Sequence, residues 1–200
     1  MAKPKGKSIN YRITVEEFER FTEEFKNESD RAAVILGASQ LDILLYQMLE
    51  GHLLPNPSGK DELLDGDSPL ATFSSRINIC YRLGLIDAEF ARALHLVRKI
   101  RNSFAHEVSG VSLSSGPHRD RIKELVAPFA QNWAVPNILE KNFGDDHSVG
   151  NQFRAVIALM SLRLDGAVER VTRASYPSAA DLLPPDRKTE VDGNQANENS

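Results

Sequence analysis

Cysteine is nearly absent from this sequence. Cys80 is the one cysteine among 200 residues, so neither an intramolecular disulfide framework nor a cysteine-built zinc site can form. Its apolar neighbours Ile77, Ile79 and Leu83 predict that Cys80 packs in the core and does not act as a nucleophile or a redox switch. Such low cysteine usage fits a reducing compartment, and we expect a cytoplasmic protein.

Long apolar runs are also missing. The longest, residues 34–49, is interrupted by Ser39, Gln40, Asp42 and Gln47, whereas a membrane-spanning helix needs about 20 predominantly apolar residues. The lysines near the N-terminus are not followed by the apolar stretch of a signal peptide. We therefore expect neither membrane association nor export.

Signatures of common enzymes are missing as well. The sequence has no Gly-rich phosphate loop, no His-Glu-x-x-His metal helix and no Gly-x-Ser-x-Gly elbow. The 5 histidines include no ligand-like pair on one helix face. We accordingly expect no metal site and no cofactor.

Positive charge is not in excess. The 24 basic and 28 acidic residues give a formal net charge of -4, whereas non-specific DNA affinity comes mainly from basic groups that neutralise phosphates. The sequence also shows no helix-turn-helix with a basic recognition helix. Strong direct binding to duplex DNA is therefore not expected.

What the sequence does contain is helical periodicity. Apolar residues recur at steps of three and four, with no competing strand pattern, between a flexible basic tail at residues 1–13 and a C-terminal tail at residues 176–200 that we expect to be disordered. This pattern predicts an all-α, single-domain bundle of about six helices over residues 14–175.

The expected helix boundaries come from capping and breaking residues. A capping-box spacing of Thr14 and Glu17 begins the first helix, and Ser68 followed by Pro69 is expected to begin the third. Asp87 is expected to cap the fourth. The second, third, fifth and sixth helices are expected at about residues 29–51, 69–83, 118–130 and 150–174, and the fourth ends near Ala105 or Glu107.

The most informative stretch lies at the end of the fourth helix. At about 100° per residue, Arg101 falls about 20° from Phe90 and therefore on the apolar stripe of that helix. Because a guanidinium stays charged when buried, this position requires a carboxylate partner, a rim location or a ligand. The candidate carboxylates are Glu28, Asp30 and Asp42.

Arg101 and His106 have the Arg-x4-His spacing that resembles the motif of HEPN nucleases, small helical proteins that cleave RNA without a metal. The resemblance implies that His106 transfers protons at the ribose, Arg101 stabilises charge on the phosphate, and Asn102 orients one of them or donates a further hydrogen bond. In one continuous helix Arg101 and His106 lie about 140° apart, so they converge only if the helix ends between them or a second subunit completes the site. The other interpretation of His106 is a histidine that bonds the last carbonyls of the helix.

A longer resemblance rests on blocks at residues 28–34, 40–45, 63–66, 69–77, 81–86 and 99–106. In this order they resemble the mannitol operon repressor family of bacterial regulators, over about Val15 to His106. That family implies an all-helical regulator without an obvious DNA-reading module. Its family-type residues here are Glu28, Ser29, Asp30, Arg31, Asp42, Phe73, Arg76, Arg101, Asn102 and His106.

Some of these residues also have purely structural interpretations. Ser29 is placed to cap the second helix, and Phe73 is placed to enter the core. Arg76 has Asp65 and Asp67 as candidate partners for an ion pair.

Two functions follow from the sequence. The first is a non-catalytic bacterial transcription-regulatory or interaction protein that acts through a partner protein, self-association or a ligand, because direct DNA reading is disfavoured by charge. The second is a HEPN-like metal-independent endoribonuclease, toxin or RNA-binding module that uses Arg101, Asn102 and His106.

Overall fold

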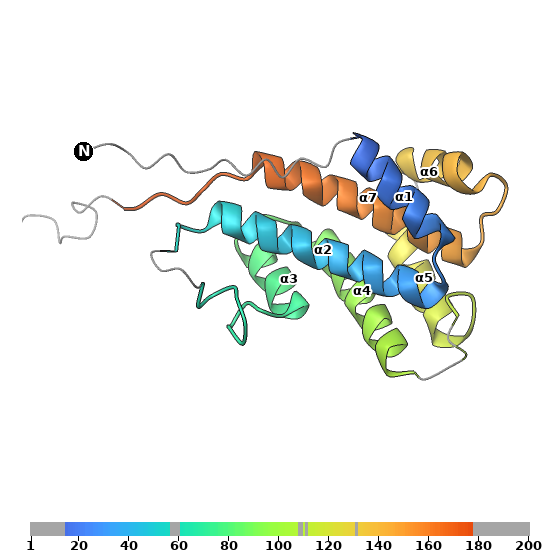
Figure 1. Ribbon diagram of the computed structural model, residues 1–200, viewed down its shortest axis with the longest axis horizontal. Coiled ribbons are helices and arrows are strands. Elements are labelled where there is room, and N and C mark those ends of the chain that lie inside the picture. Colours follow the sequence, from blue (N-terminus) through green and yellow to red (C-terminus); the bar gives the residue numbers. More distant parts are fainter. Residues whose placement is uncertain (1–14, 57–60, 108–109, 111, 131, 178–200) are drawn as a thin grey trace, which may run out of the picture.

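The protein is described by a computed structural model that covers residues 15–56, 61–107, 110, 112–130 and 132–177, with side chains from residue 20 onward. Over these residues the chain forms a single all-α bundle without strands (Figure 1). The elements are α1 (Val15–Asn27), α2 (Asp30–His52), α3 (Phe73–Arg82), α4 (Ala88–His106), α5 (Gly116–Val126), the 3₁₀ turn η1 (Ala127–Phe129), α6 (Ala134–Phe143) and α7 (Val149–Arg170). The predicted fold class is confirmed. The predicted capping box at Thr14, the basic tail and nearly all of the C-terminal tail lie outside the described residues.

Helices α2 and α7 form the centre of the bundle. They lie side by side, with α3 and α4 against α2, and with α1 and α6 against α7 (Figure 1). Leu41 and Leu45 on α2 and Val156 and Met160 on α7 are fully buried. Each such side chain contributes roughly 1.5–3 kcal/mol when it leaves water, so this pair of helices supplies much of the core.

Several helix ends follow the sequence signals. The Ser29 hydroxyl accepts the Ala32 N–H at 3.2 Å, and the Asp87 carboxylate accepts the Phe90 N–H at 2.7 Å. Both side chains satisfy backbone donors that have no partner inside the helix. The predicted caps of α2 and α4 are confirmed.

The start of α3 was predicted wrongly. Pro69 does not begin the helix, because it occupies the second position of a turn in which the Ala71 N–H donates to the Ser68 carbonyl at 3.1 Å. The helix begins at Phe73, where Thr72 and Ser75 form a reciprocal capping box.

Helix α6 was not predicted. Pro136 suggested a break, yet it stands in the first turn of α6, two residues after Ala134. A proline is tolerated there because the first backbone N–H groups of a helix have no intrahelical acceptor to lose.

Candidate functional site

The Arg-x4-His residues lie on one uninterrupted helix. Helix α4 continues to His106, and Arg101, Asn102 and His106 all belong to it. Arg101 and His106 are both exposed, and Arg101 Nη1 donates to Asn102 Oδ1 at 3.2 Å. Because the helix does not end between them, the two side chains point about 140° apart. One chain alone does not bring them to a common phosphate.

The side chain of Arg101 is exposed, which agrees with a rim location, one of the three alternatives that the sequence left open. Ile100 is the residue of this turn that is fully buried, together with Val97 and Phe104 on the turns beside it. Arg101, one residue further along the helix, therefore turns towards solvent. It needs no buried counter-charge, and the predicted ion pairs with Glu28, Asp30 or Asp42 are not formed.

Asp42 has a different partner. Arg76 Nη1 lies 2.9 Å from Asp42 Oδ1, and Arg76 Nε donates to the Leu70 carbonyl at 3.0 Å. The guanidinium also lies over the Tyr46 ring, 5.1 Å from its centroid. The predicted pairing of Arg76 with Asp65 or Asp67 was thus wrong, and Arg76 fastens α3 and the preceding loop to α2. Phe73 is half-buried and packs against the core.

Asp30 and its neighbours form a second set of polar contacts, at the other end of α2. Asp30 Oδ1 lies 3.4 Å from Arg154 Nη1, and Arg154 Nη2 donates to the Glu28 carbonyl at 2.7 Å. Asp30 Oδ2 accepts the Leu113 N–H at 2.9 Å. Arg31 donates to the backbone carbonyl of Glu107, next to the end of α4. Arg154 was missed at the sequence level, although a single arginine in the apolar run 153–160 was its signal.

An apolar groove lies between α1, α6 and α7. It has a volume of about 700 Å³, and Trp133 beside it is 78% exposed. Leu162 of α7, also in the groove, is 47% exposed. The other lining residues are Arg20, Thr22, Glu23, Ala134, Asn137, Ile138, Lys141 and Asn142. Sequence reasoning missed this groove because α6 itself was not predicted.

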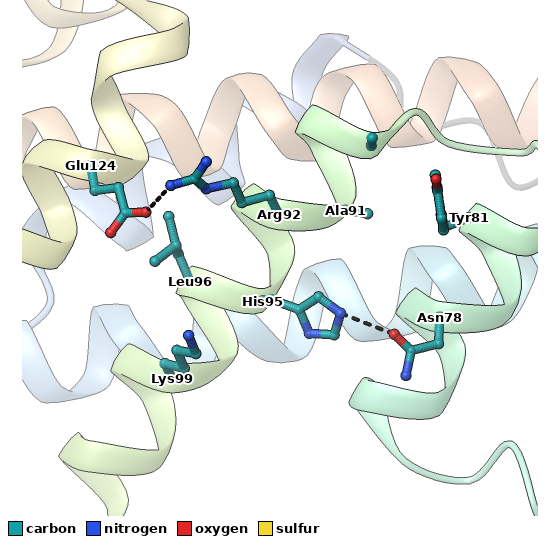
Figure 2. A pocket seen from close by; sticks show the side chains of 9 residues that line it. Asn78, Tyr81, Ala91, Arg92, His95, Leu96, Lys99 and Glu124 are labelled. Atoms are coloured by element: carbon teal, nitrogen blue, oxygen red, sulfur yellow. Dashed lines mark hydrogen bonds and ion pairs between the residues drawn. The ribbon is translucent and has the colours of Figure 1, made fainter.

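A second pocket, of about 520 Å³, lies between α3 and α4 and reaches α5 (Figure 2). His95 from α4 hydrogen-bonds Asn78 Oδ1 of α3 through Nε2 at 3.0 Å. Arg92 Nη2 of α4 pairs with Glu124 Oε1 of α5 at 2.6 Å. Burial lowers the pKa of His95 below its usual value, and the neighbouring positive charges lower it further. His95 is therefore neutral near pH 7.

Other features of the described residues bear on the possible chemistry. They include no group of three or more His, Cys, Asp or Glu side chains placed to hold a metal ion. Cys80 is fully buried, and burial raises the pKa of its thiol to about 12, so it is a core residue as predicted. By length and composition alone, helix α2 is long and apolar enough to span a membrane. Half of its apolar 18-residue stretch is buried in the bundle.

No known protein family, curated protein or solved structure matches this chain significantly.

Proposed function

We propose that this protein is a non-catalytic regulatory protein that acts by binding a partner protein and not by reading duplex DNA. Trp133 carries the proposal, because it is the one tryptophan of the sequence and is 78% exposed at the apolar groove. Tryptophan is enriched among the residues that dominate the binding energy of protein interfaces. The resemblance to the mannitol operon repressor family supports a role in transcription regulation.

The groove favours an apolar helical segment as its occupant. Its walls come from three helices, and the half-buried Ile138 and half-exposed Leu162 offer apolar contacts beside Trp133. A helix with apolar residues at steps of three and four is a common occupant of such grooves.

The charges at the groove select the partner further. The groove lining holds two positive side chains, Arg20 and Lys141, and one negative side chain, Glu23, which lies 3.4 Å from Lys26. A partner helix with carboxylates beside its apolar stripe would match this arrangement. The occupant is therefore an acidic amphipathic helix of a second protein.

The proposal can be tested by complementation in the native host. A strain that lacks the gene is supplied with the wild type, Trp133→Ala or the matched control Tyr176→Ala, and transcript levels are measured across the genome. Tyr176 is also an exposed aromatic residue, at 72%, but does not line the groove. We expect the wild type and Tyr176→Ala to restore the transcript pattern and Trp133→Ala not to restore it. The purified Trp133→Ala protein should have the same melting temperature as the wild type, which shows that it is folded.

Two results would contradict this proposal. Restoration of the pattern by folded Trp133→Ala would show that the groove is not used. A wild-type dimer that Trp133→Ala converts to a monomer, as measured by light scattering, would identify a second copy of the chain as the occupant.

A metal-independent ribonuclease is the second candidate. The exposure of both Arg101 and His106 favours it, since RNA can reach both residues from solvent. Their opposed directions on α4 require that two chains share one site. If the wild type cleaves RNA, mixing inactive Arg101→Ala with inactive His106→Ala should restore part of the cleavage, because a mixed dimer holds one complete site. No restoration after subunit exchange would exclude a shared site.

A further inference from the structure

The pocket between α3 and α4 is separate from both the Trp133 groove and the Arg-x4-His residues. Its volume of about 520 Å³ falls within the range of roughly 300–1,000 Å³ that is typical of small-molecule sites. Ala88, Ala91 and Leu96 give it an apolar lining, and ionisable and aromatic side chains stand around them. Figure 2 shows His95 between Lys99 and Asn78, with Tyr81 on the α3 side and the Arg92–Glu124 pair on the α5 side.

One part of this pocket is suited to an anion. Glu124 neutralises Arg92 at 2.6 Å, whereas among the described residues no carboxylate forms an ion pair with the exposed Lys99. Arg98 adds a further positive charge close to His95. The positive charge around His95 is therefore larger than the single carboxylate of the pocket can offset. An oxyanion there would gain charge-assisted hydrogen bonds from Lys99.

The other part of the pocket presents an aromatic ring. Tyr81 is 47% exposed, on the last turn of α3, beside the apolar Ala88. A half-exposed ring at a pocket wall provides a surface on which a planar ligand group can stack, as bases stack on aromatic side chains in nucleic-acid sites.

We propose that this pocket binds a small phosphate ester that carries a planar ring, of the nucleoside monophosphate class. The phosphate lies against Lys99 and His95, and the ring lies against Tyr81. The Arg92–Glu124 pair closes the α5 side. Such a ligand would act as an effector, at a place distinct from the groove proposed for the partner protein.

A bound phosphate also changes the protonation of His95. The charged and titratable groups around His95 are Tyr81 on α3, Arg92, Arg98 and Lys99 on α4, and Glu124 on α5. In the free protein the cations among them favour neutral His95. A phosphate beside the ring favours the imidazolium, so the pKa of His95 rises when the ligand binds.

The test measures binding of adenosine 5′-monophosphate, ribose 5-phosphate and inorganic phosphate to the full chain by calorimetry. Lys99→Ala should weaken binding of the nucleotide about tenfold or more, since it removes a charge-assisted contact. The matched control Lys123→Ala removes the same charge from an exposed position outside the pocket and should leave affinity unchanged. Tyr81→Leu should weaken binding of the nucleotide about tenfold but leave the affinity for ribose 5-phosphate unchanged. In an NMR titration, the pKa of His95 should rise when the nucleotide is present.

The contradicting results are equally specific. No binding of the nucleotide to the folded wild type would overturn the proposal, as would binding that neither Lys99→Ala nor Tyr81→Leu weakens. If ribose 5-phosphate binds as tightly as the nucleotide, the planar ring does not contribute to binding, and that part of the proposal is refuted. An unchanged pKa of His95 in the complex would place the phosphate elsewhere.

Discussion

Removal of the Asp30 carboxylate should destabilise the protein strongly. Arg154 is 6% exposed, and Asp30 is its one ion-pair partner among the described residues. Deleting one partner of a buried pair costs about 3–5 kcal/mol, because the other charge stays buried without compensation. The Asp30 side chain is 30% exposed and its contact with Arg154 is 3.4 Å long, which places the ionic contribution near the lower limit. The lost acceptor for the Leu113 N–H adds about 1 kcal/mol.

We therefore expect Asp30→Ala to lower the free energy of unfolding by about 4 kcal/mol, as measured by urea denaturation monitored by circular dichroism. Asp30→Asn should cost less, because its amide oxygen still accepts the Leu113 N–H. Adding Arg154→Met to Asp30→Ala should recover part of the loss, since it removes the uncompensated charge. Asp120→Ala, at an exposed position on α5, serves as control and should stay within about 0.5 kcal/mol of wild type. A cost below about 1 kcal/mol for Asp30→Ala would refute this reasoning.

Three further predictions concern other parts of the core. Arg76→Met should cost about 2–3 kcal/mol of unfolding free energy because it leaves the half-buried Asp42 without its partner, and a loss below about 0.5 kcal/mol would contradict that role. Gly37→Ala should lower the melting temperature, because the added Cβ would lie 2.8 Å from Ile157 Cγ2 and overpacking of this kind costs about 1–3 kcal/mol. A higher melting temperature would show that α2 and α7 move apart easily to make room for the methyl group. Cys80, with its pKa raised to about 12, should resist a thiol reagent at pH 8 until urea unfolds the chain, and prompt labelling of folded protein would contradict its burial.

Local sequence signals predicted the α-helices of the described residues except α6, and some of the helix ends. Ser29 and Asp87 cap α2 and α4 through backbone groups only three residues away, so the sequence contains the whole interaction. The apolar periodicity of α7 likewise reflects burial along one helix. Pro136 misled because its effect depends on whether it stands in the first turn of a helix or further in. The local signal for that start was Asn132, whose Oδ1 accepts the Ala134 N–H at 3.0 Å, and it was missed.

Pairings between distant segments could not be predicted in this way. Arg76 lies 34 residues from Asp42 in the sequence, while Asp65 and Asp67 are nearer in the chain but not its partners. For Arg101, an angle on an ideal helix wheel did not reveal that its neighbour Ile100 takes the buried position. The pocket around His95 combines side chains from three helices, and its existence depends on how those helices pack.

The most direct test of the central claim, that this protein acts by binding and not by catalysis, is an RNA cleavage assay. Purified wild type, Arg101→Ala and His106→Ala are incubated with a labelled single-stranded RNA pool in EDTA, and the products are separated on a denaturing gel. We expect no cleavage above the buffer control for any of the three proteins. Cleavage by the wild type that is lost in both variants would contradict the claim and establish a metal-independent ribonuclease.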